Sequence, residues 1–156
     1  MSLRLPLYSS LLLLSLPAFA ATHKVDLDYR IRFLPESNQA EVSITLEEGE
    51  RVRSLDFNLG EDGRFSDFKA DGQWSQEQAG RGKWQPGDGK SVLSYRVLID
   101  HQRKPGRYDA RMTQDWALFR GDDLVPAAKL DQKDKTDLVA RLQFDLPKGW
   151  KSVETG

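Results

Sequence analysis

The chain contains no cysteine, only two histidines and no excess of charge of either sign. The absence of cysteine excludes disulfide bonds, thiolate nucleophiles, cysteine-based metal sites and a lipid anchor on an N-terminal cysteine. The 23 lysines and arginines are balanced by 24 aspartates and glutamates. Because no basic surplus is available to neutralise phosphates, the composition argues against a nucleic-acid partner.

The two histidines, His23 and His101, are far apart in the sequence, and no H-E-x-x-H motif accompanies either of them. We therefore predict no metal site, and nothing in the sequence points to a cofactor. The carboxylates form short clusters without the alternating ligands and central glycine of a calcium loop, which favours a solvated surface. There is also no G-x-S-x-G nucleophile elbow, so we predict no catalytic residues.

Residues 1–20 have the pattern of a secretory signal peptide. Arg4 is the only charge in this stretch, an apolar run from Leu11 to Leu16 follows it, and Ala18 and Ala20 provide an A-x-A cleavage pattern. The run is too short and too interrupted by proline and serine to span a bilayer. The sequence thus predicts a mature chain beginning near Ala21, a periplasmic or secreted location, no retained membrane anchor and one domain over residues 22–156.

Strict alternation of apolar and polar residues dominates the mature chain and is typical of half-buried strands. It predicts strands at 25–33, 42–46, 52–59, 65–70, 91–99, 115–119 and 139–146. Residues 73–89 are rich in glycine, glutamine and proline, which favours a loop or a frayed hairpin, and residues 131–137 resemble a polar connection. No stretch shows a helical apolar stripe. We therefore expect an all-β fold, a single antiparallel β-sandwich.

The four tryptophans are the best candidates for a functional role. Trp74 and Trp84 fall in the glycine-rich region, where aromatic side chains on loops can stack on sugars or hold peptides. Filling of the core is the competing interpretation for both residues. For Trp116 and Trp150, which adjoin predicted strands, we favour a place in the core. Trp74 and Trp84 are therefore the predicted binding residues.

The second half of the chain has a familiar order of segments. Ser94-Tyr-Arg-Val97 lies in a strand, a run from Trp116 to Pro126 follows, and a last strand ends in Leu146-Pro-Lys-Gly-Trp150. This order resembles the N-terminal β-sandwich domain of the glycyl-aminopeptidase family of exported bacterial metallopeptidases, over most of 24–153. In that family the zinc motif lies in a later helical domain, so the resemblance carries no catalytic residue to this chain.

The resemblance implies a non-catalytic module that supports a neighbouring domain or binds peptide. A second hypothesis, from the residues alone, is a free-standing periplasmic carbohydrate- or ligand-binding module that uses Trp74 and Trp84. A third is a hydrolase built on carboxylates, which no motif supports. Beyond these partners, peptide or protein in the first case and carbohydrate in the second, the sequence points to no other ligand.

Overall fold

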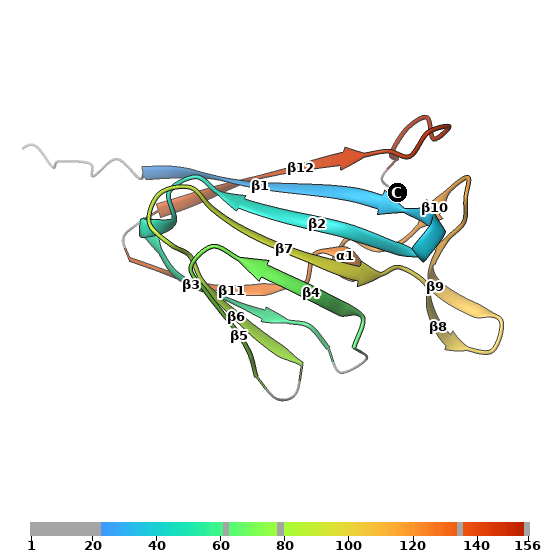
Figure 1. Ribbon diagram of the computed structural model, residues 1–156, viewed down its shortest axis with the longest axis horizontal. Coiled ribbons are helices and arrows are strands. Elements are labelled where there is room, and N and C mark those ends of the chain that lie inside the picture. The colour runs from blue at the N-terminus through green and yellow to red at the C-terminus, as the bar shows by residue number, and fades with distance from the viewer. Residues whose placement is uncertain (1–22, 61–62, 78–79, 134–135, 155–156) are drawn as a thin grey trace, which may run out of the picture.

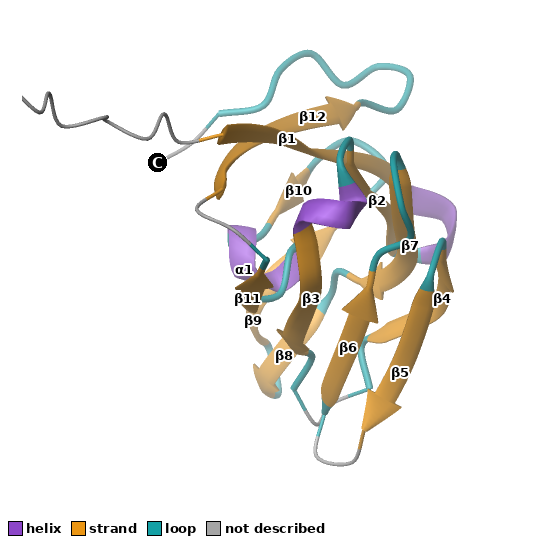
Figure 2. Cartoon of the chain, turned by 90° about the vertical axis from the view of Figure 1, so that its left-hand side faces the viewer, coloured by secondary structure: helices purple, strands orange, loops and turns teal. Residues whose placement is uncertain are grey.

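The computed structural model describes residues 23–60, 63–77, 80–133 and 136–154 of the chain. The predicted signal peptide, residues 1–20, lies outside the described residues. The described part is built almost entirely of strands, which form two sheets packed face to face and a smaller sheet at one end (Figures 1 and 2). The predicted all-β sandwich is confirmed.

The larger sheet has five strands, in the spatial order β12-β1-β2-β7-β4. Their bounds are β1 His23–Leu34, β2 Gln39–Leu46, β4 Phe65–Ala70, β7 Ser91–Leu98 and β12 Thr136–Asp145. Between β1 and β2 the chain turns through a short 3-10 helix, η1 Pro35–Ser37. The turn closes at Asn38, whose left-handed backbone (φ 54°) is a conformation that asparagine tolerates better than most residues.

The second sheet has four strands in the order β11-β3-β6-β5, and it packs against the larger sheet. Its strands are β3 Val52–Asn58, β5 Gln73–Glu77, β6 Arg81–Gln85 and β11 Ala128–Gln132. A 3-10 helix, η2 Gly49–Arg51, leads from β2 into β3. A three-stranded sheet extends from one end of the sandwich (Figure 1), with strands β8 His101–Lys104, β9 Arg107–Met112 and β10 Ala117–Leu118.

The core of the sandwich comes from the alternation seen in the sequence. Along β2 every second residue is buried, and Val42, Ile44 and Leu46 are fully enclosed while their neighbours face solvent. The same alternation holds in β7, where Leu93, Tyr95 and Val97 point inward. Because successive side chains on a strand point to opposite faces, this pattern fixes which face of each strand meets the other sheet.

One pairing departs from the antiparallel arrangement. β12 runs parallel to β1 over ten consecutive residue pairs, from His23 with Thr136 to Arg32 with Asp145. All other pairings among the described strands are antiparallel. The last described strand, β12, thus pairs with the first, β1, and it forms an edge of the larger sheet.

Several segments differ from the sequence-based expectations. The region 73–89, expected to be a loop or a frayed hairpin, contains the antiparallel pair β5 and β6, in which Trp74 lies opposite Trp84. Residues 128–132 form β11, which includes the first two residues of the predicted polar connection at 131–137. The predicted strand at 115–119 shortens to β10, and one turn of helix, α1 Gly121–Leu124, follows it.

Candidate functional site

An apolar groove opens at one end of the sandwich, where the five-stranded sheet extends beyond the four-stranded sheet. Its volume is about 830 Å³. Its lining comes from the inner face of β1 and β12, from residues 115–125 (called the 115–125 wall below) and from residues 149–154 after β12. The sheet face contributes Ile31, Phe33, Leu142, Phe144 and Leu146 to the lining. The groove is therefore a part of the core that the second sheet leaves uncovered.

The register of β1 and β12 shows why the groove is apolar. Leu142 pairs with Tyr29 and Phe144 pairs with Ile31, so these side chains share the inner face of the larger sheet. Ile31 is only 1% exposed, but Leu142 on the adjacent strand is 54% exposed. A leucine on an inward-facing strand position is ordinarily buried. At Leu142 the inner face lacks a covering layer.

Exposed apolar side chains gather around this opening. Among the described residues, six large hydrophobic side chains are exposed, and four of them line the groove: Trp116, Leu118, Leu142 and Val153. Such side chains are common singly on a protein surface, whereas a contiguous apolar patch marks an interaction site. The grouping identifies the groove as the strongest candidate site of the described chain.

The base of the groove is a cluster of aromatic rings around Phe33. The Phe33 ring lies parallel to that of Phe144, with centroids 6.0 Å apart. It also contacts Phe119 at 5.5 Å and Trp150 at 5.2 Å. Aromatic pairs at these separations are favourable beyond the area that they bury. The cluster therefore gives the groove a rigid base on which the more exposed side chains stand.

Hydrogen bonds fix the segments on the two sides of the opening. The Trp150 indole donates its Nε1 proton to the carbonyl of Gln114, at 2.9 Å. Thr113 accepts at Oγ1 from the backbone N–H groups of Asp115 and Trp116, each at 3.2 Å. This local turn, of a kind that threonine hydroxyls form, turns the chain so that the Trp116 side chain remains outside the core. Trp116 is consequently 47% exposed.

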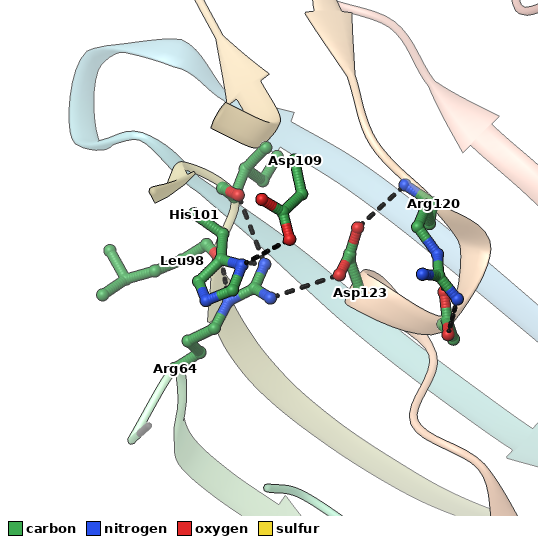
Figure 3. Close-up of polar contacts among 8 residues, drawn as sticks. Arg64, Leu98, His101, Asp109, Arg120 and Asp123 are labelled. Atoms are coloured by element: carbon green, nitrogen blue, oxygen red, sulfur yellow. Dashed lines mark hydrogen bonds and ion pairs between the residues drawn. The ribbon is translucent and has the colours of Figure 1, made fainter. Parts of the chain in front are cut away.

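A largely buried ion pair attaches the 115–125 wall to the sandwich (Figure 3). Arg64, just before β4, places Nη1 3.3 Å from Oδ1 of Asp123 in α1. Its Nη2 donates to the carbonyls of Leu98 and Ile99, at 3.0 and 3.2 Å. The second carboxylate oxygen of Asp123 accepts from the backbone N–H of Arg120. A charged pair with so little exposure is tolerated because hydrogen bonds satisfy both of its partners.

A second buried contact holds the same wall. The Tyr95 hydroxyl donates to the carbonyl of Leu124, at 2.8 Å. Burial raises the pKa of the Tyr95 phenol well above its ordinary value, so the group stays a neutral donor. Leu124 itself is fully buried. The 115–125 wall thus belongs to the folded sandwich, although its outer side chains are exposed.

The outer face of the larger sheet, by contrast, is a ladder of ion pairs. Arg30 makes two bonds to Asp145, at 2.8 and 3.1 Å, and Arg141 lies 2.8 Å from Asp26. The hydrogen bond and charge of Arg30 lower the pKa of the Asp145 carboxyl. Arg30 and Arg141 are 58% and 57% exposed, so this face is a solvated surface and its ion pairs contribute little to stability.

The two histidines lie at different places in the sandwich, and each contacts a carboxylate. His23, at the start of β1, bonds through Nε2 to the Glu48 carboxylate at 2.9 Å. His101 opens β8 at the opposite end of the long strands (Figure 1), and its Nδ1 lies 3.2 Å from Asp109, beside Arg64 (Figure 3). Within the described ranges, no group of three or more histidine, aspartate or glutamate residues is placed to hold a metal ion.

The two tryptophans that the sequence singled out lie elsewhere, opposite each other on β5 and β6. Trp84 is fully buried and donates Nε1 to the carbonyl of Asp71 at 2.8 Å. The ring of Trp84, for which the sequence predicted a binding role, therefore lies in the core of the sandwich. Trp74 is half-buried and stacks on Phe68 at 4.2 Å. The strand alternation of 73–77 and 81–85 turns both rings inward.

Sequence reasoning missed the residues that line the groove. It favoured the core for Trp116 and Trp150, and the structure leaves Trp116 half exposed. The alternation in the run Trp116-Ala-Leu-Phe-Arg could have indicated this exposure. Trp116 and Leu118 alternate there with Ala117 and Phe119, so the two aromatic side chains point to opposite sides and only one of them can face the core. Leu142 carried no such signal, because its strand position is identical in pattern to buried ones.

Comparisons with known proteins add little to this geometry. No protein-family model matches the chain, and no curated protein matches it in sequence. Two solved structures of a GH20 exo-β-N-acetylglucosaminidase from Vibrio harveyi, one with N-acetylglucosamine and one an inactive mutant, are similar to it at 12% identity and a TM-score of 0.32. Each comparison covers 87% of this chain, which spans about a fifth (20%) of the enzyme. Among the described residues, no helix is long and apolar enough to cross a membrane.

Proposed function

We propose that this chain is a non-catalytic binding module whose apolar groove holds an extended, apolar segment of another polypeptide. The observation that carries the proposal is the uncovered inner face of β12, where Leu142 is 54% exposed beside a nearly inaccessible Ile31. Apolar surface of this kind gains about 25 cal/mol for each Å² that a partner removes from water.

The lining favours a polypeptide segment over a small charged ligand. The lining contains two basic residues, Arg120 and Lys151, and three acidic ones, Asp115, Asp122 and Glu154. Arg120 is paired with Asp122 through two hydrogen bonds, of 3.0 and 2.7 Å. The remaining lining is dominated by leucine, phenylalanine and tryptophan side chains. Aromatic anchors set in an apolar base with a polar rim are the usual composition of a polypeptide-binding surface.

The resemblance to the N-terminal domain of the glycyl-aminopeptidase family suggests that the partner is a neighbouring domain or a peptide. We propose that the module is exported, to the periplasm or beyond, and that a neighbouring domain or a peptide presented beside it covers the groove. Cell fractionation with an antibody against the mature chain tests the location. Recovery of the chain in the cytoplasm with residues 1–20 still attached would contradict this part of the proposal.

Binding is tested with an array of ten-residue peptides in which apolar and charged residues alternate, including ten-residue segments of β1 itself. Peptides that retain the purified chain are then titrated in solution by fluorescence anisotropy. The decisive variant is Leu142→Asp, which places a charge on the uncovered inner face. We expect it to weaken binding at least tenfold, or about 1.4 kcal/mol.

Leu98→Asp is the matched control. Leu98 is 41% exposed on β7 of the same sheet, but it lies on the outer face, because Val97 and Ile99 on either side are buried. We expect Leu98→Asp to bind the peptides as the unaltered chain does. A second pair, Trp116→Ala and Tyr108→Ala, compares an exposed aromatic residue in the groove with one outside it.

Two results would contradict the proposed function. One is the absence of any retained peptide at concentrations of about 1 mM, which corresponds to a binding free energy of only about −4 kcal/mol. The other is equal weakening by Leu142→Asp and Leu98→Asp, because a specific groove must distinguish the two faces of one sheet. Binding of glycans in place of peptides, lost on Trp74→Ala, would instead support a carbohydrate module.

A further inference from the structure

The free edge of β12 is an unusual feature of this sandwich. β12 lies at the end of the five-stranded sheet and pairs with β1 alone among the described strands. The pairing runs through ten residues without a register shift. Along the other side of β12, the backbone N–H and C=O groups that point away from β1 have no strand partner in the part of the chain that the structure describes. A long edge of this kind is a template for another extended chain.

The other edge strands of the described sheets are shorter, and the pairings of three of them, β4, β8 and β11, contain register shifts. β4 has six residues and a register shift between Ser66 and Lys69, with Asp67 in a left-handed conformation (φ 56°). β11 has five residues and a shift between Asp131 and Gln132. Short length and bulges are the means by which sheet edges avoid pairing with other chains. β12 has neither of these devices, and it contains no proline and no lysine.

This edge borders the apolar groove. Leu142 and Phe144 of β12 line the groove from the inner face of the sheet. The segment that follows β12 turns beyond the C-terminal end of the strand and does not lie along it (Figure 1). A strand added to the free edge would lie about 4.8 Å from β12. Every second side chain of that strand would then point into the space beside Trp116 and Leu118.

We propose that the polypeptide segment binds by strand addition to the free edge of β12, extending the larger sheet to six strands. The inference rests on the proposed function and adds the mode of recognition to it. The main-chain groups of the segment pair with those of β12, and its alternate apolar side chains fill the groove. An acyl chain could fill the same groove, but it has no groups to pair with the strand edge, so an extended backbone is the occupant that fits both features.

The test uses N-methylated versions of the tightest-binding peptide from the array. N–H groups along a strand point alternately to its two edges, so methylation of every second residue blocks one edge only. Two peptides are made, one methylated at the odd positions and one at the even positions. Both are titrated against the full mature chain, with amide hydrogen exchange followed in residues 138–144.

Strand addition predicts that one methylated peptide binds at least tenfold more weakly than the parent peptide, while the other stays within about threefold of it. The parent peptide should also slow amide exchange along the free edge of β12. Equal binding of both methylated peptides would overturn strand addition, as would the loss of both. If the parent peptide itself remains sensitive to Leu142→Asp in those cases, the groove still binds and the proposed function survives.

Two further outcomes separate this inference from others. If no peptide in the array binds at all, the proposed function fails and the mode of recognition fails with it. If sedimentation instead shows a dimer of the chain in which the β12 amides are protected without peptide, the occupant is a second copy and the inference is wrong. A monomer that binds with the selectivity described above supports it.

Discussion

The hydroxyl group of Tyr95, in the middle of β7, donates a 2.8 Å hydrogen bond to the backbone carbonyl of Leu124 at the end of α1. Both residues are buried, and they are 29 positions apart in the sequence. The contact joins the core of the larger sheet to the 115–125 wall. One side of the groove is therefore held from inside the sandwich, so its position depends on core residues as well as on surface ones.

We expect Tyr95→Phe to lower the free energy of unfolding by about 1–2 kcal/mol, because the Leu124 carbonyl would remain buried without a partner. Urea unfolding followed by circular dichroism measures this loss. Tyr108→Phe is the control, since Tyr108 is 44% exposed and its hydroxyl can bond to water. Equal stability of the Tyr95→Phe variant and the unaltered chain would show that the contact is not formed.

The Arg64–Asp123 pair gives a second prediction about the same wall. The two side chains are only 10% and 15% exposed, so Arg64→Met leaves the Asp123 carboxylate largely buried without its cation. We expect a loss of about 3 kcal/mol in the free energy of unfolding. Arg53→Met removes an ion pair of similar geometry, with Asp131, in which both side chains are 55% exposed. That variant should lose less than about 1 kcal/mol.

The positions of two tryptophans can be compared in one experiment. Trp84→Ala should cost about 3–5 kcal/mol of stability, because it empties a site that is fully buried. Trp116→Ala, at a 47% exposed ring, should change stability by less than about 1 kcal/mol while weakening peptide binding. The reverse order of the two stability losses would contradict the assignment of Trp84 to the core and of Trp116 to the groove.

The architecture could be predicted from the sequence because the alternation of apolar and polar residues in β1, β2 and β7 indicates which side chains face inward. The parallel return of β12 to β1 could not, because a strand with alternating residues fits either direction of pairing. The site was predicted at Trp74 and Trp84 on the ground that their neighbours are polar. Their exposure depends on the opposing sheet, which covers Trp84 completely. The exposure of Leu142 depends in the same way on the opposing sheet, which does not extend over it. Its sequence pattern therefore could not identify it as a groove residue.

The lowered pKa values of two carboxyl groups predict how the stability of the fold depends on pH. Hydrogen bonds from its own backbone N–H and from that of Gly89 lower the pKa of Glu50, and the hydrogen bond from Arg30 lowers that of Asp145. A carboxyl with a lower pKa in the folded state binds protons more readily when unfolded. Its contribution is therefore present above its unfolded value, near pH 4, and is lost as the pH falls through the folded value.

We expect the double variant Glu50→Gln, Asp145→Asn to lose less stability on acidification than the unaltered chain. Urea unfolding at a series of pH values from about 7 down to about 2.5 gives both curves, and they should converge at the acid end. Two curves that remain parallel over the whole range would show that these groups do not contribute to the acid sensitivity of the fold.

The proposed binding site depends on the exposure of the inner face at Leu142. Thiol labelling measures this exposure, because the chain has no cysteine of its own. The rate of maleimide labelling is compared for Leu142→Cys, for Gln143→Cys on the exposed outer face and for Ala40→Cys in the core. We predict that the thiol at position 142 reacts nearly as fast as that at position 143, and that a bound peptide protects only the former. Labelling at 142 as slow as at 40 would contradict the account.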